Sequence, residues 1–466
     1  MAIFQNNLLA GAGAQSSDST YTIDQSLRFD AAATVNLIDS SVGAGDTRKK
    51  NTFSVWVKRG NLGVLMYLLG YRYDGTNYQY MSFDTSNRLE FTDVSGGSVI
   101  GKLITNRVFR DPSAWYNLTF VWDTANQISS ERMIIYVNGV RETSFNTATY
   151  PSLNVDSGGA GRASSDIRVG TYDASGAFFD GYMANIVYID NGALNASSFG
   201  ETNDNGIWIP KDVSGLTFGT RGFYVDGRDA SDLGDDESGN GNDFSSGLSA
   251  HDQVLDSPTN NFAVYNILYN VGDVDFPTYS EANLSVDFNY FGKRSPVSTF
   301  ALPTDSDAYC EFYIKTSASG THNSGVGIGQ GDANNAGNVA LTNGVSYNFN
   351  GYKTVGGSAS TFGNSYTAGD IIGVYFDLSD NEVDFYKNNT LEGSISLSTL
   401  SGDLFFLVAN NATDQQVIIA NFGQDDTFAG NKTSGSAGAS DSSGNGKFYY
   451  TRISGAKALC SKSLGS

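Results

Sequence analysis

The sequence predicts an all-β protein with two β-sandwich (jelly-roll) domains in tandem, preceded by a short N-terminal docking segment. Three observations support this fold class. The chain of 466 residues contains 54 glycines and 26 tyrosines, only 17% of its residues are charged, and its apolar residues recur in short alternating runs. Long surface helices need more lysine and glutamate, whereas short strands separated by turn residues match both the composition and the pattern.

The first 20 residues are too few and too polar to form a core of their own. Their larger apolar side chains are those of Ile3, Phe4, Leu8 and Leu9, and small polar residues follow them. The segment either has no fixed structure or places these side chains on another protein, and we expect docking.

The first predicted sandwich covers residues 21–225, where strands follow one another at short intervals. In one of them Phe53, Val55 and Val57 share a face, and this period of two predicts that the face lies in the core. Further strands are predicted in TYTIDQSLRF (20–29), AWYNLTFVWD (114–123), MIIYVNGV (133–140), DIRVGTY (166–172) and FFDGYMANIVYID (178–190).

Residues 226–278 are predicted to be an acidic, glycine-rich linker, because nine acids and one base fall between Val225 and Asp256. A second sandwich is predicted at 279–466. Its clearest element is a hairpin in DIIGVYFDLSDNEVDFYKNN (370–389), since the runs before Asp380 and after Asn381 both alternate.

A short motif, D-x-S-G-N-G followed by an aromatic residue, occurs at 236–244 and again at 441–449. The first half resembles a calcium loop, but such a loop needs a glutamate at position 12, where this chain has Gly247 and Arg452. Asp, Ser, Asn and Gly are also the residues of tight turns. The motif therefore favours two turns over two calcium sites, and no metal site is predicted from it.

Composition argues against several classes of function. The formal net charge of −21 makes nucleic acid an unfavourable partner, and no apolar stretch is long enough to insert into a membrane. The two histidines, His251 and His322, lie far apart, so a histidine-based triad or zinc site is not expected. Cys310 and Cys460 are expected to be free thiols, although one disulfide between them stays open.

No catalytic residues are predicted, and we expect a protein that is not an enzyme. A glycosidase would need two carboxylates facing one cleft, about 5–9 Å apart. Glu382 and Asp384 have a suitable spacing along a strand, but they flank the predicted hairpin turn, where exposed acids are common.

A saccharide-binding site is the sharper hypothesis, because such a site needs aromatic platforms beside polar loop residues. The stretch YRYDGTNYQY (71–80) supplies tyrosines around a turn, and GTYDASGAFFDG (170–181) is a similar loop. The alternative is that these tyrosines alternate on a hairpin without a ligand. The candidate ligand-binding residues are Tyr71, Tyr73, Asp74, Tyr78, Tyr80, Tyr172 and Asp173.

Both domains resemble known families. Residues 21–225 resemble a laminin-G-type, concanavalin A-like jelly roll through SVWVKRG (54–60), AWYNLTFVWD (114–123), YVNGV (136–140) and FDGYMANIVYIDNGAL (179–194). Residues 279–460 are similar to SPRY domains through GDIIGVYFDLSDNEVDFYKNN (369–389), VIIANFGQ (417–424) and KFYYTRISGAKALC (447–460). The second domain departs from that pattern with AYCEF (308–312) in place of a tryptophan-rich strand, and with Asn388-Asn389 in place of Asn-Gly.

The order of the parts resembles virion structural proteins of tailed phages of the marine and cyanobacterial type, through LITNRVFRDPSAWY (103–116), SGNGND (238–243) and SPTNNFA (257–263). The resemblance implies a fibre or appendage component of the virion, made in the host cytoplasm. Its implied partners are other virion proteins, copies of itself, most plausibly as a trimer, and a glycan of the host surface. It implies no cofactor, although the first domain's family allows calcium. The alternatives are a structural decoration protein of capsid, neck or tail, and a polysaccharide depolymerase.

Overall fold

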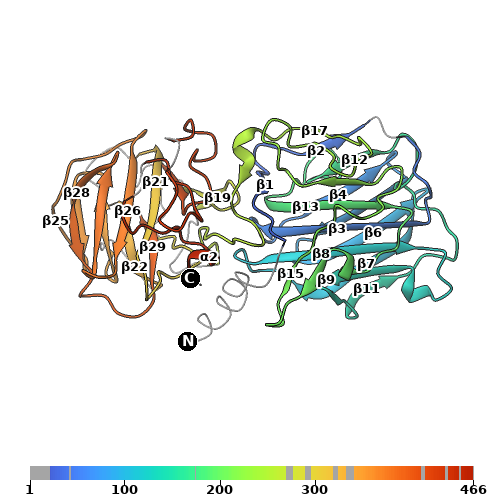
Figure 1. The fold of residues 1–466 in the computed structure, drawn as a ribbon, viewed down its shortest axis with the longest axis horizontal. Coiled ribbons are helices and arrows are strands. Elements are labelled where there is room, and N and C mark those ends of the chain that lie inside the picture. The colour runs from blue at the N-terminus through green and yellow to red at the C-terminus, as the bar shows by residue number, and fades with distance from the viewer. Residues whose placement is uncertain are drawn as a thin grey trace. The chain divides into compact units, whose positions relative to one another are not determined.

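The computed structural model describes residues 21–40, 43–173, 175–268, 277–288, 295–317, 324–331, 341–410, 415–435, 439–450 and 453–464. The chain forms two compact units, divided between Thr259 and Asn260 (Figure 1). Both are built of strands, which confirms the predicted all-β fold class. The predicted docking segment, residues 1–20, lies outside the described residues. No helix in the described ranges is long and apolar enough to cross a membrane.

The first unit contains two large antiparallel sheets, which we call sheet A and sheet B. Sheet A has the order β10 (Val140–Arg141), β9 (Met133–Val137), β8 (Trp115–Asp123), β3 (Lys50–Arg59), β13 (Gly181–Asp190), β1 (Ser26–Phe29) and β18 (Gln253–Val254), and β16 (Phe223–Val225) also pairs with β13. Sheet B has the order β11 (Phe145–Thr149), β7 (Ser98–Val108), β6 (Arg88–Ser95), β5 (Tyr78–Phe83), β4 (Met66–Arg72), β12 (Asp166–Val169), β2 (Leu37–Asp39) and β17 (Ser245–Ser246). The smaller elements are β14 (Gly200–Thr202), β15 (Trp208–Pro210), η1 (Ser129–Glu131), η2 (Ala196–Ser198) and η3 (Ala250–Asp252).

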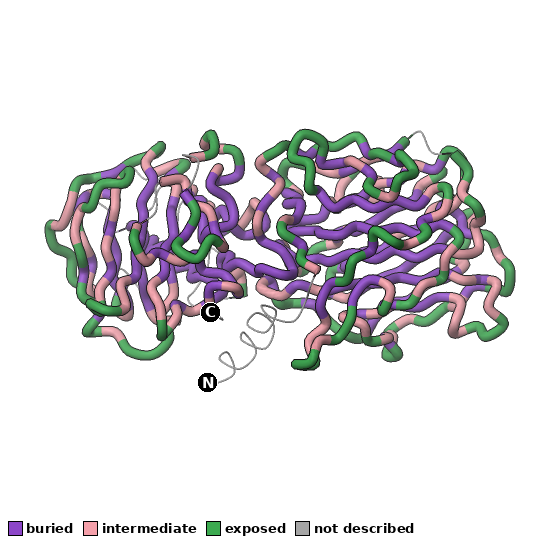
Figure 2. Tube along the Cα trace, in the orientation of Figure 1, coloured by how far each residue is buried: buried purple, intermediate pink, exposed green. Residues whose placement is uncertain are grey.

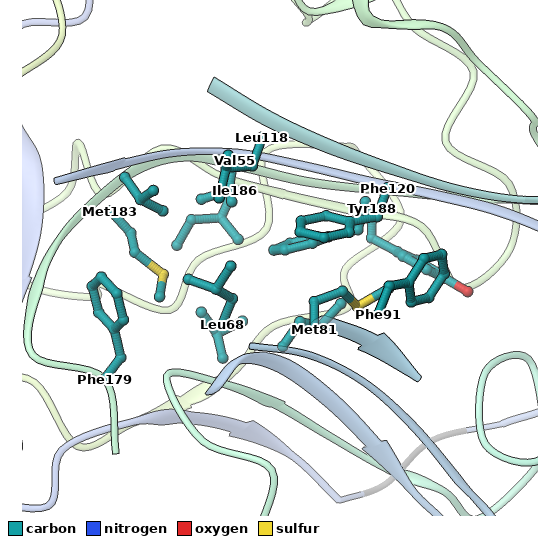
Figure 3. Close-up of a cluster of buried hydrophobic side chains, with 14 of the residues drawn as sticks. Val55, Leu68, Met81, Phe91, Leu118, Phe120, Phe179, Met183, Ile186 and Tyr188 are labelled. Atoms are coloured by element: carbon teal, nitrogen blue, oxygen red, sulfur yellow. The ribbon is translucent and has the colours of Figure 1, made fainter. Parts of the chain in front are cut away.

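The core of the first unit lies between sheets A and B, where side chains from the two inner faces interleave (Figure 3). The alternation predicted for Phe53, Val55 and Val57 is confirmed, since all three are buried in this core. Each fully buried side chain of this size stabilises the fold by about 1.5–3 kcal/mol. Further core residues are Leu118 and Ile186 from sheet A, and Leu68, Met81 and Phe91 from sheet B.

The outer face of sheet A is also buried. Lys58 points away from the core, yet its side chain is fully buried, and its Nζ lies 2.7 Å from Oδ2 of Asp256. Burial is the main cause that lowers the pKa of Lys58, and Asp256 opposes it. The same carboxylate accepts a 3.0 Å hydrogen bond from Nε1 of Trp115. The segment around Asp256 therefore packs against the outer face of this sheet.

The predicted linker at 226–278 is the clearest difference from expectation. Residues 226–259 belong to the first unit, because β17 pairs with β2 and β18 pairs with β1. Most of the segment's acids are used inside turns, as when Asp226 and Asp229 accept hydrogen bonds from the backbone two residues later. Residues 262–265 are buried within the second unit. The many acidic residues that suggested a solvated linker therefore accept hydrogen bonds within the turns of a folded segment.

Both D-x-S-G-N-G motifs form turns, which confirms that interpretation. Asp236 accepts hydrogen bonds from the backbone N–H groups of Tyr224, Ser238 and Asn242, each at 2.9 Å. Asp441 does the same for the second motif, with N–H donors from Asn445 at 2.7 Å and Ala458 at 2.9 Å. In each motif, the aspartate carboxylate thus binds its own turn to a neighbouring strand or loop.

The second unit also contains two antiparallel sheets. One has the order β19 (Thr278–Ser280), β20 (Ser285–Phe288), β30 (Gln416–Asn421), β21 (Ala308–Thr316), β26 (Ile371–Asp377), β27 (Glu382–Lys387) and β28 (Thr390–Ser396). The other has the order β25 (Ser358–Thr361), β24 (Tyr352–Val355), β23 (Gly344–Asn348), β22 (Gly325–Gln330) and β29 (Leu404–Ala409), and a short helix α2 (Ser461–Leu464) follows. Buried residues run along the strands of both units, while exposed residues gather in the connections (Figure 2).

The hairpin predicted at 370–389 is confirmed as β26 and β27, which pair up to Asp377 and Glu382. The next turn joins β27 to β28 through Asn388 and Asn389, whose φ angles are 48° and 69°. Two consecutive left-handed residues make the type I′ hairpin turn, which asparagine adopts more readily than other residues with a side chain. Asn-Asn therefore takes the place of Asn-Gly without changing the turn.

Cys310 and Cys460 are both free and buried. Burial raises the pKa of Cys460 to about 11 and raises that of Cys310 well above its usual value. Both are therefore neutral thiols that pack as small apolar side chains.

Candidate binding site

Three of the predicted site residues, Tyr78, Tyr80 and Tyr172, come together on the outer face of sheet B. A fourth tyrosine, Tyr67, joins them, and we call these four residues the tyrosine cluster. Their ring centroids lie 5.1 Å apart for Tyr67–Tyr80 and Tyr78–Tyr172, 5.3 Å for Tyr67–Tyr172, and 5.7 Å for Tyr80–Tyr172. All four side chains are half-buried, so part of each ring is open to solvent.

Strand alternation directs these rings outward. On β5, Gln79, Met81 and Phe83 are buried on the inner face, and Tyr78 and Tyr80 alternate with them and point the other way. On β4 the pairing with β5 is irregular between Tyr67 and Leu69. Such an irregularity shifts the alternation by one residue. Tyr67 therefore lies on the outer face, although the residues that follow it are buried.

Gly70 allows Tyr172 to lie against the sheet. A Cβ atom at Gly70 would sit 2.7 Å from the Cα of Tyr172, closer than real Cβ atoms approach. Hydrogen bonds hold the Tyr172 loop to β4 on both sides, from Tyr67 N–H to the Ala177 carbonyl at 3.1 Å and from Gly170 N–H to the Leu68 carbonyl at 3.0 Å. The position of Tyr172 is thus fixed by the backbone.

A charged rim surrounds the rings. Glu90 accepts a 2.7 Å hydrogen bond from the hydroxyl of Tyr80, and the Nζ of Lys102 lies 2.7 Å from the same carboxylate oxygen. Arg72 forms a 3.9 Å ion pair with Asp173, and its guanidinium lies 5.6 Å from the ring centroid of Tyr172. Burial raises the pKa values of Tyr67 and Tyr172 to about 12, so their hydroxyls stay protonated at neutral pH.

Asp173 is the fourth predicted site residue at this place. Its Oδ1 accepts hydrogen bonds from the backbone N–H and the hydroxyl of Ser175, and these bonds lower the pKa of Asp173 against the effect of burial. Asp173 therefore shapes its loop and, with Arg72, contributes to the rim.

The other three predicted residues do not join the cluster. Tyr71 is buried in the core and packs against Tyr188 at 5.0 Å, so a ligand on the surface would not reach it. Tyr73 is 42% exposed and lies under the guanidinium of Arg162, whose Cζ is 3.6 Å from the ring centroid. Asp74 accepts hydrogen bonds from the backbone and hydroxyl of its own turn, and these bonds lower its pKa to about 2.

Tyr67 was missed because it precedes the tyrosine-rich stretch 71–80 from which the candidates were taken, and a period of two places it in phase with Leu69 and Tyr71, which are buried. The letters around it, Met66-Tyr67-Leu68-Leu69-Gly70, contain one usable signal. Two consecutive leucines within an alternating strand indicate a bulge, and a bulge would move the preceding aromatic residue to the other face.

The arrangement supplies aromatic surface together with fixed hydrogen-bonding groups. Sugars present apolar C–H faces and a periphery of hydroxyls, which match partly open tyrosine rings beside carboxylate, ammonium and guanidinium groups. Within the described ranges, no group of three His, Cys, Asp or Glu side chains is arranged to hold a metal ion.

Several solved structures match parts of the chain at low identity. The SPRY domain of human HERC1 matches with 16% identity and a TM-score of 0.27, over 29% of this chain and 87% of its own. A candidate carbohydrate-binding protein from Bacteroides ovatus matches with 12% identity and a TM-score of 0.35, over 49% of this chain and 59% of its own. Domain 4 of the Geobacillus stearothermophilus arabinanase AbnA, solved with arabinotriose, matches with 17% identity and a TM-score of 0.25, over 35% of this chain and 68% of its own. The SPRY-like identification of residues 279–466 stays a prediction.

A family model matches part of the first unit. No curated protein gives a significant match to the chain. Residues 30–198 match the laminin-G-type model of the Concanavalin A-like lectin/glucanases superfamily, and this range includes the whole tyrosine cluster. Residues 30–198 of the first unit are therefore similar to concanavalin A-like domains.

Proposed function

We propose that this protein binds carbohydrate, without catalysis, through the tyrosine cluster on the outer face of sheet B. A concanavalin A-like lectin fold fits a glycan-binding role. The observation that carries the proposal is the convergence of four half-buried tyrosines from β4, β5 and the 170–179 loop, beside Glu90 and Arg72. The rings offer a platform for a sugar face, and the two charged groups offer bonds to its hydroxyls.

The charges favour a neutral saccharide as the ligand. The cations at the cluster are compensated, because Arg72 pairs with Asp173 and Lys102 pairs with Glu90. The chain as a whole carries a formal charge of −21, and the described residues of this surface include no unpaired cation that would offset its repulsion of an anionic polymer. A neutral glycan needs no cation for binding and is not repelled by the negative charge of the chain.

The biological setting that we propose is adhesion by a phage virion, as a fibre or appendage component that contacts a host-surface glycan. It rests on the resemblance of the sequence to virion proteins, and assembly as a homo-oligomer would multiply weak contacts into useful avidity. The alternative is a purely structural role in capsid, neck or tail. Deleting residues 1–20, which contain Ile3, Phe4, Leu8 and Leu9, tests the docking role: the truncated protein should fold but fail to join particles. If it joins particles, the docking proposal is wrong.

Binding of the full-length protein to immobilised neutral polysaccharides, namely a glucan, a mannan and a galactan, tests the carbohydrate proposal. We expect saturable binding to at least one of them, weakened about tenfold or more when Tyr78→Ala and Tyr172→Ala are combined. Tyr73→Ala is the matched control, since it removes an exposed tyrosine of the same domain outside the cluster. The proposal fails if none of the polysaccharides binds, or if the double variant binds like the wild type.

A further inference from the structure

The second unit has its own surface group of aromatic side chains, brought together from distant parts of the chain. Tyr313 on β21 lies 5.6 Å from Phe428, Phe428 lies 6.1 Å from Tyr449, and Tyr449 lies 5.0 Å from Tyr450 (ring centroids). Phe428 is buried beneath this group, whereas the three tyrosines are half-buried. We call Tyr313, Tyr449 and Tyr450 the second-unit tyrosines.

A buried carboxylate fixes two of these tyrosines. Glu311 on β21 is fully buried, and its Oε2 and Oε1 accept hydrogen bonds from the backbone N–H groups of Tyr449 at 2.7 Å and Tyr450 at 3.0 Å. The segment that carries both rings is therefore tied to the central sheet. Rings that are held in place before a ligand arrives lose less conformational freedom when it binds.

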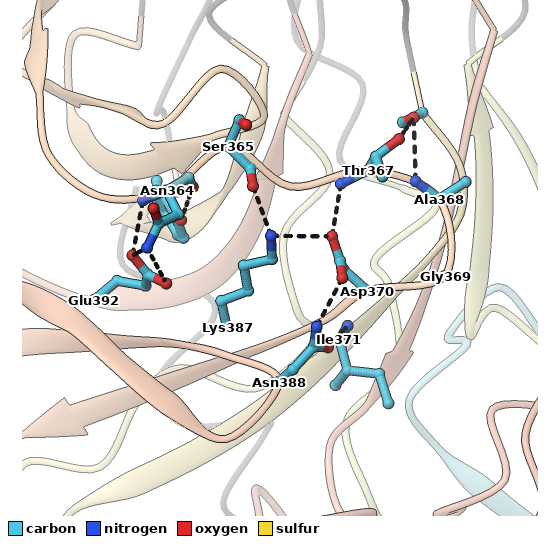
Figure 4. A network of polar contacts seen from close by, with 12 residues as sticks. Asn364, Ser365, Thr367, Ala368, Gly369, Asp370, Ile371, Lys387, Asn388 and Glu392 are labelled. Carbon is cyan, nitrogen blue, oxygen red and sulfur yellow. Dashed lines mark hydrogen bonds and ion pairs between the residues drawn. The ribbon is translucent and has the colours of Figure 1, made fainter.

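Polar groups form a rim beside the rings. In Figure 4, Asp370 accepts a 2.7 Å hydrogen bond from Nδ2 of Asn388 and lies 3.5 Å from Nζ of Lys387. The Oδ1 of Asn388 also lies 3.4 Å from the hydroxyl of Tyr450. The rim is therefore continuous with the second-unit tyrosines, and its lysine and aspartate neutralise each other.

Lys432 differs from the other cations at these two surfaces. Its Nζ donates a 2.9 Å hydrogen bond to the carbonyl of Gly369 and lies 5.0 Å from the ring centroid of Tyr313. Of the carboxylates in the described ranges, none lies within ion-pair distance of Lys432, whereas Lys387 pairs with Asp370. An ammonium group has three N–H donors, so this one can still bind an anion.

We propose that the second-unit tyrosines and Lys432 form a second saccharide site, and that its ligand is a sugar bearing a carboxylate. The sugar face would pack on the tyrosine rings, and its carboxylate would bind the ammonium group of Lys432. The first unit, where the cations are paired, takes a neutral sugar under the function proposed above, but the second site does not depend on that function.

The experiment measures binding of an oligogalacturonate and of its methyl ester to the full-length protein by calorimetry. The ester keeps the sugar rings and removes the charge. We expect the acid form to bind more tightly than the ester. Lys432→Met should weaken binding of the acid form about tenfold or more, the size of one charge-assisted hydrogen bond, and should leave binding of the ester unchanged. Lys462→Met, on α2 of the same unit, removes the same charge elsewhere and should have no effect.

Further variants keep the proposal falsifiable if one of them misfolds. Lys432→Arg retains the charge and should retain binding, and Tyr450→Ala should weaken the acid and the ester alike. The proposal is overturned if the acid form does not bind, or if acid and ester bind with equal affinity. It is also overturned if Lys432→Met changes neither the affinity for the acid nor the affinity for the ester. The combined Tyr78→Ala and Tyr172→Ala variant separates the two sites. It should leave oligogalacturonate binding intact and weaken neutral-polysaccharide binding about tenfold or more, so either site can fail without the other.

Discussion

The buried pair of Lys58 and Asp256 gives a quantitative test of the domain boundary, because it joins the segment once expected to be a linker to the outer face of sheet A. Both side chains are fully buried, their charged atoms lie 2.7 Å apart, and Trp115 donates to the same carboxylate. Asp256→Ala leaves the ammonium of Lys58 buried without this partner. Breaking a buried pair in this way costs about 3–5 kcal/mol.

For a unit of this size, a loss of that magnitude lowers the midpoint of thermal unfolding by roughly 6–20 °C. Tryptophan fluorescence is the appropriate assay, since all four tryptophans of the chain, Trp56, Trp115, Trp122 and Trp208, precede the boundary at residue 259 and report on the first unit alone.

Two further variants make the test specific. Glu237→Ala removes an exposed acid from the same segment and should change stability by less than about 0.5 kcal/mol. Combining Lys58→Met with Asp256→Leu removes both charges and should recover part of the loss, because an apolar pair needs no counter-charge, although Nε1 of Trp115 loses its acceptor. If Asp256→Ala unfolds within 2 °C of the wild type, roughly the shift for 1 kcal/mol or less, residues 226–259 are not an integral part of the first unit.

Three other predictions follow from single positions. Gly70→Ala should push the Tyr172 loop away from the sheet, which should destabilise the first unit by about 1–3 kcal/mol and weaken binding of neutral sugars. Unfolding followed by fluorescence measures the first effect, and a binding titration measures the second. Unchanged binding would show that Tyr172 is not part of the site. Burial raises the pKa of Asp93 to about 7, so the native state holds an extra proton between about pH 4 and pH 7 and its stability falls as the pH rises through that window. Asp93→Asn should reduce the change in the free energy of unfolding between about pH 4 and pH 7 by about 2–4 kcal/mol, as measured by chemical denaturation. An unchanged pH dependence would show that the raised pKa of Asp93 does not cause it. Asn389, with φ of 69°, should tolerate glycine better than valine by about 1–2 kcal/mol, and equal stability of the two variants would argue against a left-handed turn.

The fold class was predictable because apolar residues alternate along several strands and turn residues separate the strands. On β3, Phe53, Val55 and Val57 lie where a period of two places them. The function of an acid is less visible in sequence. The sequence does not distinguish a solvated aspartate in a linker from one that accepts a hydrogen bond in a turn, such as Asp226. The hydrogen bonds in the structure make this distinction.

The candidate site was predictable in part. Tyr78, Tyr80 and Tyr172 were found because tyrosine-rich loops stand out, but Tyr71 was assigned to the wrong face. Its partner across the hairpin is Gln79, which points into the core, so Tyr71 points inward as well. Register sets the face of a strand residue, and register is a property of pairing that one strand does not contain.

The most direct measurement is hydroxyl-radical footprinting of the full-length protein, read by mass spectrometry with and without a bound neutral polysaccharide. Protection should fall on Tyr78 and Tyr172, which are partly open on sheet B, and Tyr73 should be oxidised to the same extent in both samples. Protection elsewhere, with these two rings still fully reactive, would show that sugar recognition takes place on another surface.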